Sequence, residues 1–267
     1  LDEQKNKDKI LRRFVQAGII SKKVMSQFFI ENPDFEIVIS NHAIYIPQGI
    51  ISSVSKKYGK KIISYVSGYR KNSFIFSHDE TYHFTMVDEP TSEWEDLDLN
   101  YIRDDKITKY LKSRKYGTSD WTYYFENPQF EIKDALVKKG INLKKPIITM
   151  ATNIIWDANL IYKDNIFPDM MTWVFETVEY FKLRDDLQLI IRAHPGEINY
   201  DRISNQKVKD ELIKKYKTLP KNVFIIGSDE NLSTYPLVDI SNTLIIYASK
   251  VGMEFSPFGS NVIVAGE

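Results

Sequence analysis

The stretch LIIRAHPGE, residues 189–197, carries three large apolar residues directly into Arg192 and His194. A short apolar run of this kind is typical of a strand that is buried on both faces of a parallel sheet. Pro195 lacks a backbone N–H, so it ends the strand and turns the chain away from the sheet. Ligands of open parallel sheets bind beyond the carboxyl ends of the strands. We therefore expect Arg192 and His194 to face an anionic ligand. The alternative is a surface turn with a solvated Arg–His pair, and Arg192 is the weaker candidate because it can instead brace the turn at Glu197.

Apolar strands and helical segments alternate throughout the second half of the chain. The expected strands are 146–152, 187–193, 222–227, 242–249 and 261–266. The expected helices are 167–184, with Pro168 in the first turn, 205–216, 234–241 and 250–259. This alternation predicts a doubly wound parallel sheet.

The first half shows a similar rhythm in fewer elements. Residues 1–30 have apolar residues at helical spacing with an expected break at Gly18, and strand 35–40, helix 49–59 and strand 60–66 follow. Strand–helix–strand order favours parallel pairing. We therefore predict an α/β architecture: two Rossmann-like doubly wound domains, residues 1–143 and 144–267, facing a central cleft.

Composition excludes several classes of protein. Lys plus Arg and Asp plus Glu are equal at 36 each among 267 residues, so no basic excess favours nucleic acid as a partner. The chain has no cysteine, which excludes disulfides and zinc–thiolate sites. No apolar run reaches the length of a membrane span and no signal peptide opens the sequence, so we expect a cytoplasmic protein. Its abrupt ends lead us to expect a piece of a longer protein, truncated at the carboxyl end.

A second strand end, IIYASKVGMEF (245–255), also carries polar residues. We expect Ser249 to cap the next helix, whose free N–H groups attract phosphate, and Lys250 to add positive charge. Gly252 would let a ligand approach, and the Glu254 carboxylate can accept the two hydroxyls of a ribose. The alternative is an ordinary capped helix with a surface glutamate. Together with His194, these residues predict a bound nucleotide.

The two motifs resemble those of the bacterial capsule polysaccharide biosynthesis glycosyltransferases, which have the GT-B architecture. The patterns R-x-H-P-x-E and S-x-x-G-x-E…G-x-x-V are matched by Arg192, His194, Pro195, Glu197, Ser249, Gly252, Glu254, Gly259 and Val262. The resemblance covers residues 146–267 best. It implies sugar transfer from a nucleotide sugar to a glycan or lipid-linked glycan acceptor, without cofactor or metal, at a site that Asn153 also lines. It further implies peripheral association with a membrane-bound capsule assembly complex at the inner face of the cell membrane.

The first half supplies candidates for the acceptor side. His42 follows a predicted strand, and His78, Asp79 and His83 lie close together in FIFSHDETYH (74–83). We expect all three histidines at strand ends on one side of the domain. His42 is the favoured general base, with Asp79 next, because an acceptor hydroxyl must lose its proton. A metal site from His78, Asp79 and His83 is disfavoured by their spacing, and bonds that merely shape the loops are the other alternative.

Aromatic residues near these positions can stack on sugar rings, although core packing is their commoner role. Tyr45 and Tyr82 are the candidates. Two other functions use the same kind of nucleotide site: a nucleotide-sugar 2-epimerase, and a catalytically inactive nucleotide-binding partner within a capsule assembly complex. Epimerisation needs no separate acceptor, so the acceptor-side residues distinguish these functions from transfer.

Overall fold

The structure is a computed structural model that describes residues 6–68, 70–85, 90, 92–95, 104–116, 127–157, 165–198 and 203–266. The chain divides into two compact units, Leu1–Trp121 and Thr122–Glu267. The division lies ahead of the boundary at 143/144 that the sequence led us to expect. Each unit is described by itself below.

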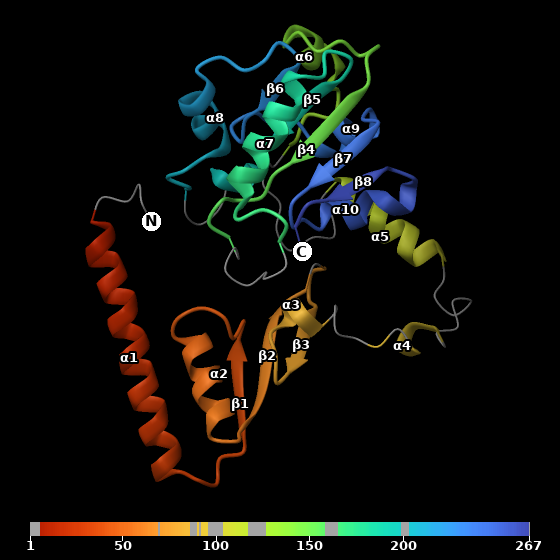
Figure 1. Cartoon of the computed structure of the whole chain (residues 1–267). Coiled ribbons are helices and arrows are strands. Elements are labelled where there is room, and N and C mark those ends of the chain that lie inside the picture. Colours follow the sequence, from red (N-terminus) through yellow and green to blue (C-terminus); the bar gives the residue numbers. More distant parts are fainter. Residues whose placement is uncertain are drawn as a thin grey trace. The chain divides into compact units, whose positions relative to one another are not determined.

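The second unit is built on a five-stranded sheet with the order β6-β5-β4-β7-β8 (Figure 1). These strands are β4 (Ile147–Ala151), β5 (Gln188–Arg192), β6 (Val223–Ile226), β7 (Thr243–Ile246) and β8 (Val262–Val264), and every pair is parallel. The chain starts at the central strand β4, extends to β6 on one side, and then returns past β4 to β7 and β8. The doubly wound parallel sheet expected here is confirmed.

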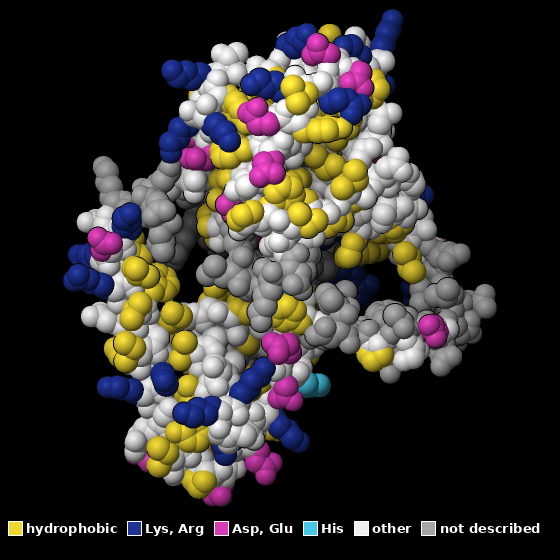
Figure 2. Space-filling view, viewed as in Figure 1, with side chains coloured by type: hydrophobic (Ala, Val, Ile, Leu, Met, Phe, Trp, Pro, Cys, Tyr) yellow, Lys and Arg dark blue, Asp and Glu magenta, His cyan; other side chains and the backbone are white. Residues whose placement is uncertain are grey.

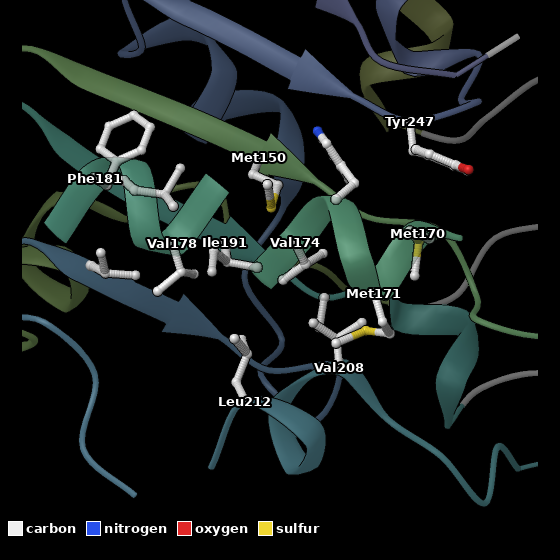
Figure 3. Packing of buried hydrophobic residues seen from close by; sticks show 14 of the residues in the cluster. Met150, Met170, Met171, Val174, Val178, Phe181, Ile191, Val208, Leu212 and Tyr247 are labelled. Atoms are coloured by element: carbon white, nitrogen blue, oxygen red, sulfur yellow. The ribbon is translucent and has the colours of Figure 1, made fainter. Parts of the chain in front are cut away.

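Helices cover both faces of this sheet. They are α6 (Lys133–Lys138), α7 (Met170–Lys182), α8 (Val208–Tyr216), α9 (Thr234–Asp239) and α10 (Val251–Phe255), with 3₁₀ turns η1 (Pro195–Glu197) and η2 (Ser256–Phe258). Successive strand residues point to opposite faces. Ile191 accordingly packs with Met150, Val174 and Val178 of one core cluster (Figure 3), whereas Ile190 packs in a second cluster with Leu136 of α6. Burial on both faces explains why these strands read as continuous apolar runs.

The start of α7 differs from the expectation. Asp169 is its N-cap, and the Asp169 carboxylate accepts the Thr172 N–H at 2.8 Å. Pro168 therefore lies before the cap and not in the first turn, because the aspartate already satisfies an N–H group that the helix leaves unpaired.

The first unit contains a smaller, mixed sheet with the order β1-β2-β3. Its elements are α1 (Lys7–Glu31), β1 (Ile37–Asn41), α2 (Gln48–Lys57), β2 (Lys61–Ser67), β3 (Phe74–His78), α3 (Tyr82–Thr85), α4 (Ser92–Glu95) and α5 (Asp104–Tyr116). The parallel β1–α2–β2 unit is confirmed, but β3 runs antiparallel to β2. The described residues of this unit do not show a second doubly wound domain.

Helix α1 is continuous, so the break expected at Gly18 is wrong. A Cβ at Gly18 would lie 3.7 Å from Ile46 Cδ1 and 3.9 Å from Ile50 Cδ1, which places this glycine where α1 packs on α2. Close packing offsets the roughly 1 kcal/mol that a glycine costs inside a helix. Much of the rest of α1 exposes apolar side chains, including Leu11, Phe14 and Val15.

The visible surface carries acidic and basic side chains interspersed over both units (Figure 2), in keeping with the zero formal charge of the chain. Within the described ranges, no helix has the length and apolar character needed to cross a membrane.

Candidate functional site

The carboxyl ends of β4, β5 and β7 meet at one edge of the second unit's sheet. Ala151 of β4 is in register with Arg192 on one side and with Ile246 on the other. The connections after β4 and β7 diverge there, which makes this edge the topological switch point where ligands of such sheets bind.

Side chains tie these strand ends together. The Thr152 N–H and hydroxyl both donate to the Arg192 carbonyl, at 3.1 and 3.2 Å. The Asn153 side-chain amide donates to the Ala248 carbonyl. Asn153 therefore lies at the switch point and bridges the chain after β4 to the chain after β7.

His194 follows β5 at the same edge. Its Nδ1 accepts the Gly196 N–H at 3.0 Å and so caps the turn η1. Burial, followed by the positive charges of Arg192 and Lys250, lowers the pKa of His194 to about 4. The imidazole is thus neutral near pH 7, and because Nδ1 accepts a hydrogen bond, Nε2 carries the proton and is a donor.

Arg192 does not face a ligand. Its side chain is buried, and its guanidinium donates to the carbonyls of Gly227 at 2.6 Å, Leu232 at 2.9 Å and Glu230 at 3.3 Å. Burial lowers the pKa of Arg192 to about 10, so the group remains charged at neutral pH. The expected phosphate contact is therefore wrong. Arg192 braces the loop 227–232, and the Glu197 carboxylate also stabilises its charge.

Glu197 also has a structural role. It is fully buried, its Oε1 accepts the Val208 N–H at 2.9 Å, and its carbonyl accepts the Ser204 N–H at 2.8 Å. The carboxylate therefore satisfies the first N–H group of α8. Burial raises the pKa of Glu197, and the bond from Val208 opposes that rise.

The junction after β7 differs from the expectation. The N-cap of α10 is Lys250, in a helical conformation and without a capping bond from its side chain, so Ser249 is not the N-cap of the helix. The Ser249 carbonyl accepts the Gly252 N–H at 3.3 Å. Helix α10 has only five residues, which leaves little helix dipole to attract phosphate.

Gly252 has a packing reason to be glycine. The residue is buried, and a Cβ there would lie 2.6 Å from Ile246 Cδ1 and 3.1 Å from Val262 Cγ1. The side chains of β7 and β8 thus pack closely against this glycine, so a larger residue would have to displace the end of Ile246.

Glu254 has a partner that the sequence did not reveal. Its Oε2 accepts a hydrogen bond of 2.7 Å from the hydroxyl of Tyr235 in α9. Tyr235 follows β6, on the side of the sheet where the strands have their carboxyl ends. The same rule that identified residues after β5 and β7 would have identified Tyr235 if it had been applied to β6.

In the first unit the structure brings His42 and His83 together. The His42 N–H donates to the Tyr65 carbonyl at 3.0 Å, beyond the carboxyl end of β1, and the rings of His42 and Tyr45 are 5.8 Å apart. Burial, followed by the nearby charge of His42, lowers the pKa of His83 to about 4. His83 Nδ1 lies 3.2 Å from the Thr81 hydroxyl. The side chain of Tyr82 lies outside the described residues.

His78 and Asp79 lie at the opposite edge of that sheet. Because β3 is antiparallel, His78 is in register with Ile63 near the amino end of β2. Asp79 exchanges hydrogen bonds with Ile62: the Asp79 N–H donates to the carbonyl at 2.7 Å, and Oδ1 accepts the N–H at 3.0 Å. The expectation that these residues share an edge with His42 is wrong, and Asp79 closes the β2–β3 pair.

The disfavoured metal site from His78, Asp79 and His83 gains no support. Over the described ranges, no three His, Asp or Glu side chains are grouped so that they could hold a metal ion.

The parallel sheet and the polar groups at its switch point define the second unit as Rossmann-like. No protein-family model matches the chain, and no curated protein matches it in sequence. The chain is similar in structure to the KpsC β-Kdo 2,4-transferase of Thermosulfurimonas dismutans, with a TM-score of 0.53 and 11% identity, over 86% of this chain and 68% of that one.

Two further structures are more distant. The S. aureus MnaA–UDP co-structure has a TM-score of 0.34 and 15% identity, over 94% of this chain and 63% of that one. A protein of Listeria monocytogenes described as a UDP-N-acetylglucosamine 2-epimerase has a TM-score of 0.36 and 13% identity, over 92% and 61%. The chain thus spans less than two thirds of the length of these two. The likeness to the KpsC transferase shows a shared fold.

Proposed function

We propose that this chain is a metal-independent glycosyltransferase of GT-B type that moves a sugar from a nucleotide sugar to a capsule or surface polysaccharide acceptor. Under this proposal, the second unit, residues 122–267, binds the nucleotide sugar, and the first unit, residues 1–121, binds the acceptor. The observation that carries the proposal is His194, a neutral imidazole with a proton on Nε2 at the switch point of a parallel sheet. The shared fold with the KpsC transferase supports it.

The donor chemistry follows from these groups. As the bond to the sugar breaks, negative charge develops on the phosphate of the leaving nucleotide. A prepositioned N–H donor stabilises such charge without reorganisation, and the His194 Nε2–H is of this kind. The Lys250 ammonium, whose charge acts on His194, adds attraction for the phosphates. Glu254 would accept the ribose hydroxyls.

On the acceptor side, His42 would take the proton of the attacking hydroxyl. Burial and the nearby His42 lower the pKa of His83, so His83 is neutral near pH 7 and is not the favoured base. Tyr45, whose ring lies against His42, would contact the acceptor sugar.

The test uses a variant that separates the two roles of His194. Asparagine is a favoured cap residue, so His194→Asn keeps an acceptor for the Gly196 N–H but loses the Nε2 donor. We expect nucleotide affinity, measured by calorimetry, to fall by about tenfold or more, since a hydrogen bond to a charged group contributes about 1.5–3 kcal/mol. The control is His78→Asn. It removes an exposed histidine at the end of β3 in the first unit and should leave nucleotide affinity unchanged.

The reaction is tested with purified protein and a panel of nucleotide sugars. Release of nucleotide that depends on a glycan acceptor supports transfer. Interconversion of the free nucleotide sugar would show the 2-epimerase, and binding without turnover would show the inactive partner. Unchanged affinity of His194→Asn would contradict the site.

A further inference from the structure

The hydrogen bond between Tyr235 and Glu254 joins two elements that are neighbours only in the folded chain. Tyr235 lies in the first turn of α9 and Glu254 lies in α10, 19 residues later. The phenol donates to one carboxylate oxygen at 2.7 Å. This bond restrains the orientation of the Glu254 carboxylate, which has about four acceptor positions in all.

Tyr235 is itself held in place by packing. Its ring lies 5.3 Å from the ring of Phe255, the residue after Glu254, and it packs against the core cluster that contains Val238 and Ile246. The Ser233 hydroxyl caps α9 by accepting the Tyr235 N–H at 3.4 Å. These contacts therefore restrict the position of the Tyr235 phenol that donates to Glu254.

Arg192 holds the loop that leads into α9. Its guanidinium binds three carbonyls of the loop 227–232, and Leu232 is only three residues before Tyr235. The Ser233 N–H donates to the Gln129 carbonyl at 2.9 Å, which fixes the same segment from its other side. Direct contacts thus run from β5 through this loop and Tyr235 to Glu254.

We propose that Tyr235 and Arg192 are positioning residues for Glu254, and that Glu254 held in this way selects ribonucleotides over 2′-deoxyribonucleotides. The inference rests on the proposed function, which assigns the ribose to Glu254. A carboxylate fixed before the ligand arrives loses little conformational entropy on binding, so its bond to the 2′-hydroxyl discriminates strongly. Arg192, placed by its motif beside His194, serves the ribose end of the site and not the phosphates.

The experiment measures a ratio of affinities. CMP, UMP, GMP and AMP are each compared with the 2′-deoxy counterpart by calorimetry on the full chain. For the nucleotide that binds best, we expect the ribonucleotide to bind about tenfold tighter or more, the effect of one hydrogen bond to a charged group. Tyr235→Phe keeps the ring and removes the hydroxyl. It should reduce the ratio at least about threefold while the affinity for the deoxynucleotide stays as in the wild type.

Two further variants complete the design. Arg192→Lys keeps the charge but loses the fork of donors, and it should reduce the ratio in the same way. Tyr216→Phe is the matched control: its hydroxyl donates to the Phe175 carbonyl at 3.2 Å, away from Glu254, and the ratio should remain that of the wild type. A merely structural role would weaken both nucleotides equally and leave the ratio unchanged.

The outcomes separate the inference from the proposed function. If the wild type discriminates and Tyr235→Phe leaves the ratio unchanged, or weakens both nucleotides alike, the positioning role is wrong and the function stands. If the wild type binds ribonucleotides and 2′-deoxyribonucleotides equally well, Glu254 does not bind the ribose and the inference fails. The same holds if Glu254→Gln keeps the affinity ratio of the wild type. If no nucleotide binds at all, the inference and the proposed function both fail.

Discussion

At the scale of single residues, the R-x-H-P-x-E motif consists of two fully buried charged side chains and one partly buried imidazole. Arg192 and Glu197 are 2% and 0% exposed, and each bonds to backbone groups of a loop or helix. His194 alone lies at the switch point with a proton on the nitrogen that does not cap the turn. Two of the three polar side chains of this motif thus bind backbone groups of the protein, and only the imidazole of His194 remains as a candidate ligand contact.

Two histidines provide a prediction about acid stability. His194 and His83 have a pKa of about 4 in the folded chain and an ordinary value of 6.5 when exposed. Between these values the unfolded chain binds more protons, so stability decreases as the pH falls from 6.5 towards 4. We expect urea denaturation curves to show a smaller loss between pH 6.5 and 5.0 in His194→Asn and His83→Gln than in the wild type.

Comparison of the wild type with the variants cancels the contributions of other titrating groups to the loss of stability. Glu197, whose pKa is raised, acts with the opposite sign, because the folded chain gains a proton there more readily as the pH falls. Its contribution is present in the wild type and the variants alike, so the difference between curves reports the histidine. Identical losses in all three proteins would contradict a neutral, buried state of these imidazoles.

At the scale of elements, the strands of the second unit could be predicted because of how they are buried. The central strands β4 and β5 are covered on both faces, so their sequences are continuous apolar runs such as residues 189–191, whereas the edge strand β8 leaves Ile263 and Val264 exposed. The direction of β3 could not be predicted in this way. The run FIFSH suits a strand of either direction, and only the pairing with β2 decides that His78 and Asp79 lie opposite to His42.

Part of the candidate site could be predicted from the sequence, because strand ends can be located from the apolar runs. Strand ends identify His194 and Asn153, since the sheet places them at one edge whatever their side chains do. The Tyr235–Glu254 bond joins two helices that only the folded sheet brings together. The expected Ser249 cap is wrong, since Lys250 is the N-cap of α10.

Helix α1 allows a matched test of packing. Phe29 is 3% exposed and its ring lies 5.6 Å from Phe28 and 5.7 Å from Tyr58, whereas Phe14 on the same helix is 55% exposed. We expect Phe29→Ala to reduce stability by about 3–5 kcal/mol and Phe14→Ala to change it by less than about 0.5 kcal/mol.

Native-state hydrogen exchange of the β1 and β2 amides measures this effect in the unit concerned. A loss of similar size in both variants would mean that the exposed face of α1 is covered in solution. That result would assign Phe14 to a packing interface.

At the scale of the whole molecule, the three core clusters of the second unit consist entirely of residues between 132 and 265. The sheet, both layers of helices and every donor-side candidate belong to this unit. An independent core is the physical requirement for a domain that folds alone. The histidine pair of the proposed acceptor side belongs to the other unit.

This separation predicts different requirements for binding and for turnover. Residues 122–267 expressed alone should unfold cooperatively and bind nucleotide within about threefold of the full chain's affinity, since the core of this unit and its donor-side candidates all belong to it. Turnover with an acceptor should require the full chain, in which His42→Ala abolishes it and leaves nucleotide affinity intact. Calorimetry and a nucleotide-release assay on the three proteins measure both quantities. Weak binding by a well-folded second unit would show that the first unit contributes to the nucleotide site, and full turnover of His42→Ala would remove this residue as the base.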